Sequence, residues 1–309
     1  MLCLVTTCLG GEPETEALDA IQGFQVPEGL QVELYADGRF LANPVAFCFD
    51  DYGRIYVAET FRMYHGVEEN RRGEDWLNDD LACQSVEDRL SMLHKWEDQF
   101  DGGMAYFTRF SERLRLVEDT DGDGRADQAT IFSDKYNHPL DGLAAGVLAV
   151  DGTIYFACLP NIYRLQDNDQ DGRAEMREVL HHGFGVRHAF IGHDLHGLTW
   201  GPDGRIYYSM GDRGFHVVNQ EGKTLHSPDR GAVLRCNPDG SELEVFATGL
   251  RNPQELAFDQ YGNLFTVDNN SDAGDRARLV YLPEGSDSGW RMEFQYLEGD
   301  NLRGPWTQE

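Results

Sequence analysis

Gly53-Arg-Ile-Tyr56 and Gly204-Arg-Ile-Tyr207 are two copies of the short pattern that decides the fold of this 309-residue chain. The other two copies are Gly152-Thr-Ile-Tyr155 and Gly262-Asn-Leu-Phe265. An aspartate stands a few residues before each glycine, as tight turns favour. Short apolar runs such as Glu255-Leu-Ala-Phe258 flank the copies. Each copy therefore predicts a turn that leads into a β-strand.

The spacing of these copies predicts a propeller. Their glycines lie 99, 52 and 58 residues apart, and the long first interval contains a highly charged segment near residues 61–107. Within it, Ser85 precedes a helical pattern of apolar residues. Without that segment the period is about 50 residues, which suits a blade of four short strands. We therefore predict an all-β, six-bladed-type propeller with about four blades recognisable and a helical insertion after the first blade. Four blades would form an open ring with exposed sheet edges, so we expect that this sequence is a truncated part of a longer protein.

The N-terminus differs in composition from the rest of the chain. Met1–Gly11 is apolar and rich in small residues, as at the end of a secretory signal, although the first basic residue is Arg39. Leu4–Cys8 also loosely resembles a lipoprotein signal. We expect residues 1–25 to be a signal-like or disordered segment and residues 26–309 to be the propeller domain. The predicted location is periplasmic or extracellular, with membrane anchoring as an alternative.

Charge and cysteine content narrow the possible functions. The formal net charge is −28, and a surface of this sign repels the phosphate backbone, so nucleic acid is excluded as a partner. Acidic side chains favour divalent cations instead. The six cysteines form no C-x-x-C pair and no C-x-x-C-H motif, so neither zinc nor covalent haem is indicated. Disulfide pairing stays open.

Two acidic segments have the spacing of calcium loops. Asp119–Asp127 and Asp167–Glu175 are near copies that begin 48 residues apart. Oxygen ligands at alternate positions, followed by glycine at position six, suit Ca²⁺. Strand-like segments flank both loops, which predicts structural calcium in hairpins; an acidic turn without metal is the alternative. The predicted ligands are Asp119, Asp121, Asp123 and Asp127 in the first loop, and Asp167, Asp169, Asp171, Glu175 and Glu178 in the second.

The third and fourth repeats carry the residues best suited to chemistry. His193 stands eight residues before Gly201-Pro-Asp203, and the strand after that turn ends at Gly211-Asp212. Gly249-Leu-Arg-Asn-Pro253 opens the next repeat. Over residues 190–292 these motifs resemble the soluble aldose dehydrogenases that use pyrroloquinoline quinone (PQQ). Their order is most similar to the membrane-bound dehydrogenase propellers of planctomycete-type bacteria.

The resemblance implies a quinoprotein dehydrogenase that oxidises a sugar or alcohol with PQQ and calcium. It also implies a cytochrome c as electron acceptor, either as a separate protein or as a domain of the same full-length protein. His193 would be the general base, because the unperturbed pKa of histidine lies near neutrality. His196 is a second candidate base. On a strand these two side chains point to opposite faces, so we expect only one to line the central cavity.

The same resemblance assigns the cofactor. Arg251 and Asn252 would hydrogen-bond the quinone carbonyl oxygens, and Arg251 would stabilise the charge that develops there. Where the family has Gly-Pro ahead of Asn-Ser-Asp, this chain has Asp268-Asn269 ahead of Asn270-Ser-Asp272. Asp268 and Asp272 are therefore the candidates to bind a cation through their carboxylates. The family's cofactor-binding lysine would lie beyond the end of this chain.

Two other functions fit the same residues. A noncatalytic, calcium-stabilised propeller would bind carbohydrate or protein, with His193 and Arg251 packing its centre. A calcium-dependent hydrolase of the lactonase type would instead use the side-chain oxygens of Asp212, Asn252 and Asp268 around a central metal.

Overall fold

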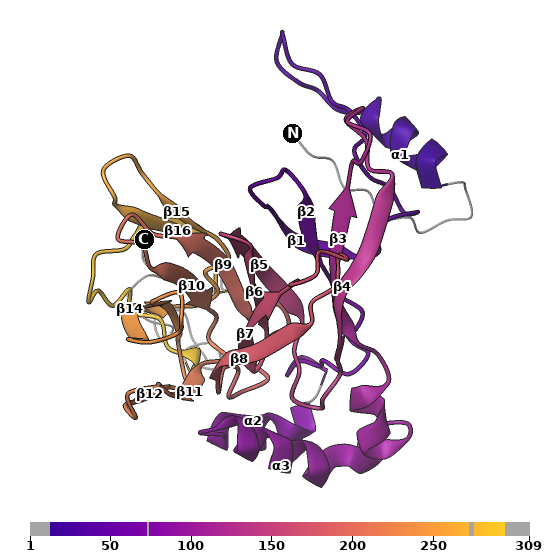
Figure 1. Ribbon diagram of the computed structural model, residues 1–309. Coiled ribbons are helices and arrows are strands. Elements are labelled where there is room, and N and C mark those ends of the chain that lie inside the picture. Colours follow the sequence, from indigo (N-terminus) through magenta and orange to yellow (C-terminus); the bar gives the residue numbers. More distant parts are fainter. Residues whose placement is uncertain (1–12, 73, 272–274, 294–309) are drawn as a thin grey trace.

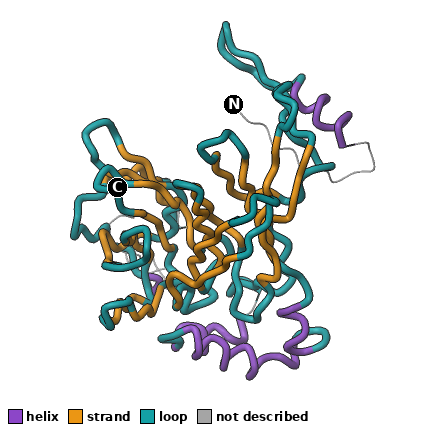
Figure 2. Tube along the Cα trace, viewed as in Figure 1, coloured by secondary structure: helices purple, strands orange, loops and turns teal. Residues whose placement is uncertain are grey.

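The computed structural model describes residues 13–72, 74–271 and 275–293. Its strands form antiparallel sheets that follow one another along the chain and stand side by side like the blades of a propeller (Figure 1). Strands and connecting loops make up most of the fold, and helices lie outside the sheets (Figure 2). The predicted all-β propeller is therefore confirmed, with four blades in the described residues.

The strands of each blade follow one another in the chain, except that the separate hairpin of two strands interrupts the third blade. The first contains β1 (Pro44–Phe49), β2 (Ile55–Glu59), β3 (Glu112–Glu118) and β4 (Gln128–Tyr136). The second contains β5 (Ala144–Val150), β6 (Thr153–Cys158), β7 (Asn161–Gln166) and β8 (Met176–His182). The third contains β9 (Leu195–Trp200), β10 (Ile206–Met210), β13 (Gly231–Cys236) and β14 (Glu244–Leu250). The fourth contains β15 (Leu256–Phe258), β16 (Leu264–Asp268) and β17 (Arg278–Tyr281).

The repeated glycines lie in the turns between the first and second strands of the blades. Gly53 and Gly262 have φ angles of 81° and 82°, a region that only glycine enters readily. In the first turn Asp50 Oδ1 accepts hydrogen bonds from the backbone amides of Tyr52 and Arg54 at 3.0 and 2.9 Å. The aspartate and the glycine together set the turn, which explains why the pattern recurs once per blade.

The hydrophobic core lies between neighbouring blades. Tyr136 of the first blade contacts Phe156 and Tyr163 of the second, with ring centroids 5.0 and 5.1 Å apart. Similar buried clusters join the second blade to the third, and the third to the fourth. Full burial of each large apolar side chain is worth about 1.5–3 kcal/mol. The blades are therefore held together mainly by side chains that alternate along their strands.

The helical insertion lies inside the first blade, which corrects the prediction that it follows that blade. It joins β2 to β3, which are antiparallel neighbours in the sheet, so their adjacent ends accept a long connection without any change in the sheet. As predicted, Ser85 begins a helix, with a capping box in which the Asp88 amide donates to Ser85 Oγ at 3.2 Å. The insertion contains η1 (Glu74–Trp76), α2 (Leu77–Ala82), α3 (Val86–Trp96), η2 (Glu97–Gln99) and η3 (Gly103–Thr108).

A second insertion, the hairpin of β11 (Phe215–Val218) and β12 (Thr224–Ser227), joins β10 to β13 in the third blade. Both insertions follow the second strand of their blade, so they extend from the same end of the propeller. Figure 1 shows α2, α3, β11 and β12 along one end of the blades, and α1 (Pro13–Ile21) near the other.

The N-terminal prediction falls partly outside the described residues. Residues 1–12 are not described, whereas α1 occupies Pro13–Ile21 and its Ala17 is buried. Among the described residues, no helix has the length and apolar character needed to cross a membrane. The four described cysteines are free thiols; Cys3 and Cys8 lie outside the described residues.

Candidate active site

His193 and Asp212 form a buried pair at one end of the third blade. His193 precedes β9 and Asp212 follows β10, and the register of these strands pairs Leu195 with Met210. His193 Nδ1 lies 2.7 Å from Asp212 Oδ1, and the two residues are 4% and 3% exposed. Gly211 permits this approach, because a Cβ there would lie 2.6 Å from the His193 carbonyl oxygen. Strand pairing therefore brings the two side chains together.

The His193–Asp212 pair orients the imidazole ring. The other Asp212 oxygen, Oδ2, accepts a hydrogen bond from Trp290 Nε1 at 2.8 Å, which holds the carboxylate in place. With Nδ1–H donating to Asp212, neutral His193 carries its lone pair on Nε2. Among the described residues, none forms a hydrogen bond with that nitrogen. An oriented imidazole with an available Nε2 is the arrangement that a general base requires.

Arg251 and Asn252 lie between β14 and β15, beside this pair. Their backbone amides donate to the Asp268 carboxylate, with Arg251 N at 3.1 and 3.0 Å from its two oxygens and Asn252 N at 2.7 Å from Oδ1. Arg278 Nη2 donates to Asp268 Oδ2 at 3.0 Å. Burial raises the pKa of Asp268, although these donors act in the opposite direction. Asp268 thus fixes the backbone of residues 251–252.

The Arg251 side chain faces the His193–Asp212 pair through aromatic rings. Its guanidinium carbon lies 5.5 Å from the ring centroids of both Phe190 and Trp290. The Arg251 carbonyl accepts a hydrogen bond from the Asp212 amide at 2.8 Å. Asn252 Oδ1 is buried and has no hydrogen-bond partner among the described residues. An amide with one unpartnered end can turn that end towards a ligand.

His196 occupies a different environment from His193. It lies in β9, where Nε2 is 2.8 Å from the Gly192 carbonyl oxygen and Nδ1 is 3.3 Å from that of Ala145 in β5. Burial lowers the pKa of its ring. His196 thus links the inner strands of the second and third blades. The expected alternation of the two histidines on one strand does not apply, because His193 precedes β9.

A second buried pair, missed by the sequence reasoning, lies next to the first. Arg213 Nη1 is 2.5 Å from Asp194 Oδ1, and both residues are almost fully buried. Arg213 Nε donates to the Arg187 carbonyl at 3.0 Å. Two successive residues before β9 are therefore joined to two successive residues after β10. The sequence signal that could have revealed this pair is the complementary charge of two dipeptides, His193-Asp194 and Asp212-Arg213.

The helical insertion supports the segment that leads to His193. Asp80 of α2 is fully buried and accepts hydrogen bonds from the backbone amides of His188 and Ala189 at 2.6 and 3.2 Å. Burial raises the pKa of Asp80 and lowers that of His188. His188 also stacks on Trp76 at a centroid distance of 5.3 Å. An insertion in the first blade thus positions a segment of the third.

The two acidic loops lie at the opposite end of the blades, because each joins the third strand of its blade to the fourth. They share an internal hydrogen bond from a glycine amide to the first aspartate, with Gly124 N 2.8 Å from Asp119 Oδ2 and Gly172 N 2.9 Å from Asp167 Oδ2. Carboxylate oxygens converge within 4.8 Å in both loops. The converging residues are Asp119, Asp121 and Asp127 in one loop, and Asp167, Asp169, Asp171 and Glu175 in the other.

Three other predicted ligands lie elsewhere. Asp123 is outside the first converging group, and its Oδ1 accepts a hydrogen bond from the Arg125 amide at 2.8 Å. Glu178 lies in β8 and forms an ion pair with Arg164 at 2.8 Å. Asp272 lies outside the described residues. The structure therefore brings together seven of the nine predicted calcium ligands.

Comparison with known proteins gives a family. Residues 16–288 match the model described as a domain of unknown function, DUF7133. The chain belongs to the DUF7133 family. This DUF7133 chain is similar to quinoprotein glucose dehydrogenase B of Acinetobacter calcoaceticus, with 32% identity over 120 residues that cover 30% of the chain and 24% of that relative. The chain is therefore similar to a quinoprotein over part of its length.

Solved structures with a similar fold include two sugar dehydrogenases. The PQQ-bound aldose sugar dehydrogenase of Streptomyces coelicolor matches with 17% identity and a TM-score of 0.46, over 85% of the DUF7133 chain and 65% of that chain. The PQQ domain of pyranose dehydrogenase from Coprinopsis cinerea matches with 14% identity and a TM-score of 0.43, over 83% and 51%. The DUF7133 chain thus spans about a quarter of the curated relative's length, and 65% or less of these two structures.

Proposed function

We propose that this chain is the propeller domain of a PQQ-dependent dehydrogenase that oxidises the hydroxyl group of a sugar or alcohol. The observation that carries the proposal is the buried His193–Asp212 pair, which leaves Nε2 of the imidazole as a proton acceptor. The similarity of 120 residues to a quinoprotein glucose dehydrogenase supports a sugar as the substrate.

His193 would remove the proton of the substrate hydroxyl through Nε2. The imidazolium that forms would be stabilised by Asp212, and Trp290 keeps that carboxylate in place. Because both members of the pair are buried, their interaction is stronger than it would be in water. Proton removal by a positioned histidine contributes about 10²–10⁴-fold to a rate.

The residues fit PQQ in part. The Arg251 guanidinium and the Nδ2–H groups of Asn252 are donors suited to the quinone carbonyl oxygens. The buried Asn252 Oδ1 is an acceptor and would instead take a hydrogen bond from a donor group of a ligand. When bound, PQQ supplies the acceptor for the hydride that leaves the carbon of the oxidised hydroxyl group. Asp268 does not fit as a cofactor ligand, because its oxygens already accept hydrogen bonds from residues 251, 252 and 278.

The proposal is tested by dye reduction with the full-length protein, PQQ and CaCl₂, using a panel of aldoses and alcohols. We expect activity that depends on PQQ and falls about 10²–10⁴-fold in His193→Gln. His94→Gln, on the exposed side of α3, is the matched control and should keep full activity. A protein that neither binds PQQ in a spectroscopic titration nor reduces the dye would contradict the proposal.

The proposal extends to the electron acceptor and the location. We place the protein in the periplasm or outside the cell, where a c-type cytochrome would take the electrons. The same assay with a purified cytochrome c in place of the dye tests this step. Reduction of the dye without reduction of any cytochrome would restrict the proposal to the oxidation half-reaction.

A noncatalytic, calcium-stabilised propeller is the second candidate function. The observation in its favour is that His193, Arg251 and Asn252 are only 2–5% exposed, so access to them is narrow. Carbohydrate binding without any oxidation would favour this candidate. The lactonase alternative has less support, because the oxygens of Asp212 and Asp268 already interact with donors of the protein.

A further inference from the structure

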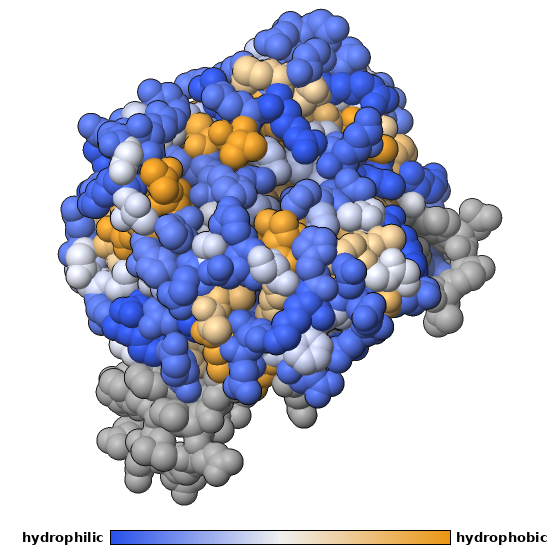
Figure 3. Space-filling view, turned by 90° about the horizontal axis from the view of Figure 1, so that it is seen from below, coloured by the Kyte–Doolittle hydropathy of each residue, from blue (hydrophilic) through white to orange (hydrophobic). Residues whose placement is uncertain are grey.

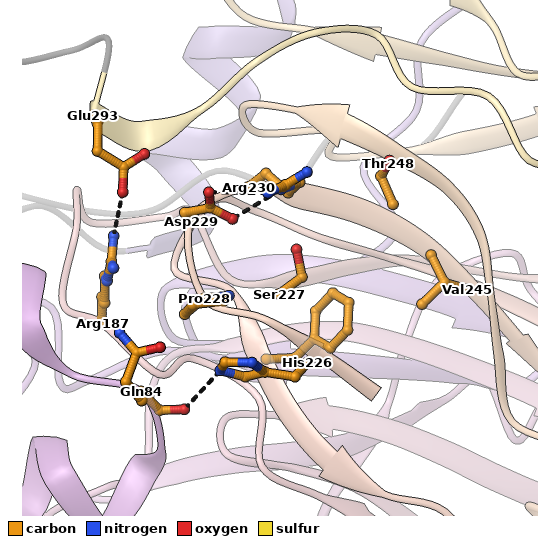
Figure 4. Close-up of a pocket in the computed structure, with 11 residues that line it drawn as sticks. Gln84, Arg187, His226, Ser227, Pro228, Asp229, Arg230, Val245, Thr248 and Glu293 are labelled. Carbon is orange, nitrogen blue, oxygen red and sulfur yellow. Dashed lines mark hydrogen bonds and ion pairs between the residues drawn. The ribbon is translucent and has the colours of Figure 1, made fainter. Parts of the chain in front are cut away.

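A pocket of about 630 Å³ lies beside the β11–β12 hairpin, at the same end of the propeller as the His193–Asp212 pair (Figure 4). Its walls come from the α2–α3 junction, the segment before β9, the hairpin, and β14. Its volume is in the range of small-molecule sites. Figure 3 views the molecule from the side of α2 and α3 and shows a predominantly hydrophilic face with scattered apolar residues. The charged and hydroxyl side chains among the residues that line the pocket, such as Arg187, Ser227 and Thr248, suit a polar ligand.

Arg187 is the side chain that determines the charge of the ligand. It is only 4% exposed, yet its contacts are long: Nη1 lies 3.4 Å from Glu293 Oε1 and 3.5 Å from Met292 Sδ, and Nε lies 3.5 Å from the Cys83 carbonyl. Charge-assisted hydrogen bonds between arginine and carboxylate are about 2.7–2.9 Å long. A buried cation needs a close anionic partner, and these contacts do not provide one.

The other polar groups of the pocket suit hydroxyl groups. The side-chain hydroxyls of Ser227 and Thr248 line it and have no hydrogen-bond partner among the described residues. Arg230 is already paired with Asp229, with its Nε and Nη2 at 2.8 and 3.0 Å from the two carboxylate oxygens. That pair is neutral as a whole and can donate and accept hydrogen bonds. The charge of Arg187 is only partly compensated, so it suits a ligand with one carboxylate. The hydroxyls and the neutral Arg230–Asp229 pair around it suit several hydroxyl groups on the same ligand.

We propose that this pocket binds a polyhydroxy carboxylate, a sugar acid whose carboxylate pairs with Arg187. Figure 4 shows Glu293 at the rim, with its carboxylate directed at the Arg187 guanidinium. The Glu293 side chain is 52% exposed, so it can turn into solvent when a ligand arrives. The ligand's carboxylate thus competes with Glu293 for the same cation. This site is separate from the residues of the His193–Asp212 pair and does not rest on the dehydrogenase proposal.

The proposal is tested by isothermal titration of the full-length, PQQ-free protein with D-glucuronate and D-gluconate. D-Glucose and acetate are the comparison ligands, because each lacks one half of the proposed chemistry. We expect the sugar acids to bind about 10-fold or more tightly than either. Acetate binding as tightly as D-glucuronate would contradict the role of the hydroxyls, and equal binding of D-glucose would contradict the role of Arg187.

Variants separate ligand recognition from folding. Glu293→Gln should tighten D-glucuronate binding severalfold because it removes the competing carboxylate. Glu284→Gln removes another exposed carboxylate, one that pairs with Arg235 outside the pocket, and it should leave the affinity unchanged. Arg187→Gln should weaken binding at least about 10-fold.

Folding of the Arg187 variant is checked by circular dichroism. If that variant does not fold, Glu293→Gln and Thr248→Val carry the test, the latter with an expected loss of affinity for D-glucuronate and not for acetate. Unchanged affinity in Glu293→Gln and Thr248→Val would overturn the proposal.

Discussion

The two ends of this propeller are built from different kinds of interaction. At the loop end, which comprises residues 119–127 and 167–175, exposed or half-buried carboxylates accept hydrogen bonds from groups no more than seven residues away. At the site end, which comprises His193, Asp194, Asp212 and Arg213, buried partners are 19 residues apart and lie beside the adjacent ends of two neighbouring strands, β9 and β10. The loop end can therefore form locally, whereas the site end exists only once the third blade has folded.

The difference has an energetic consequence. Loss of one partner at the site end leaves a charge buried in a medium of low dielectric constant, and that is costly. Loss of one carboxylate at the loop end leaves its neighbours in water, where the main effect is on a bound cation. The four predictions below test this contrast in order of expected effect.

The largest effect is expected from Asp212→Asn at the site end. Asparagine keeps the shape of the side chain but no longer stabilises the imidazolium of His193, so dye reduction should fall about 10²–10⁴-fold. Asp101→Asn is the matched control, because that side chain is 94% exposed. A rate for Asp212→Asn within twofold of the wild type would show that the pair has no catalytic role.

The second prediction concerns stability at the same end. Arg213→Met leaves Asp194 buried without its cation, so the free energy of unfolding should fall by about 3–5 kcal/mol. Urea denaturation followed by circular dichroism measures this change. Arg109→Met is the control; it removes an exposed guanidinium near Asp101 and should cost about 1 kcal/mol or less. Equal losses in the two variants would remove the energetic contrast between buried and exposed pairs.

The third prediction concerns metal binding at the loop end. With a dissociation constant on the order of 10⁻⁴ to 10⁻³ M, Ca²⁺ at ~10 mM should stabilise the fold by about 1.4–2.7 kcal/mol per loop. Thermal unfolding with CaCl₂ and with EDTA measures this gain. The double variant Asp167→Asn, Asp169→Asn should lose the gain from its loop. Glu178→Gln should keep it, because Glu178 pairs with Arg164 instead.

The smallest effect is expected from the change of stability with pH that His188, in the segment before the site end, produces. Burial, with help from the charges of Arg89 and Arg213, lowers the pKa of His188 far below 6.5, so folded His188 stays neutral while the unfolded chain takes up a proton. Stability from this group is present above pH 6.5 and is lost as pH falls towards the folded pKa. At pH 5.5 the loss is on the order of 1 kcal/mol.

Denaturation at pH 7.5 and 5.5 measures that loss in the wild type and in His188→Gln. The variant should lose less stability than the wild type over this interval, by on the order of 1 kcal/mol. Asp80 has a raised pKa and acts in the opposite direction, but its contribution is present in both proteins and cancels in the difference. Parallel pH profiles for the two proteins would show that His188 is not held neutral.

The sequence predicted the propeller, the glycine turns, the Ser85 cap and both acidic loops. The turns, the cap and the loops each depend on residues less than ten positions apart, so the local pattern contains the information that they need; the propeller was predicted from the spacing of the turns along the chain. His193, Arg251 and Asn252 were found by resemblance, and the structure places them near one another. The roles of Asp212, Trp290 and Asp80 around them were missed, because their partners lie 19, 78 and 108 residues away.

By itself, then, the sequence determined how each blade turns and where its strands begin, because aspartate side chains and glycines with positive φ act on their own backbone. Only the tertiary structure decided which side chains meet. Pairing of β9 with β10 placed His193 on Asp212, and pairing of β2 with β3 put the helical insertion inside the first blade. From there α2 reaches the backbone before His193 through Asp80. The physical reason is that these contacts join distant segments and are stable only when burial removes competing water.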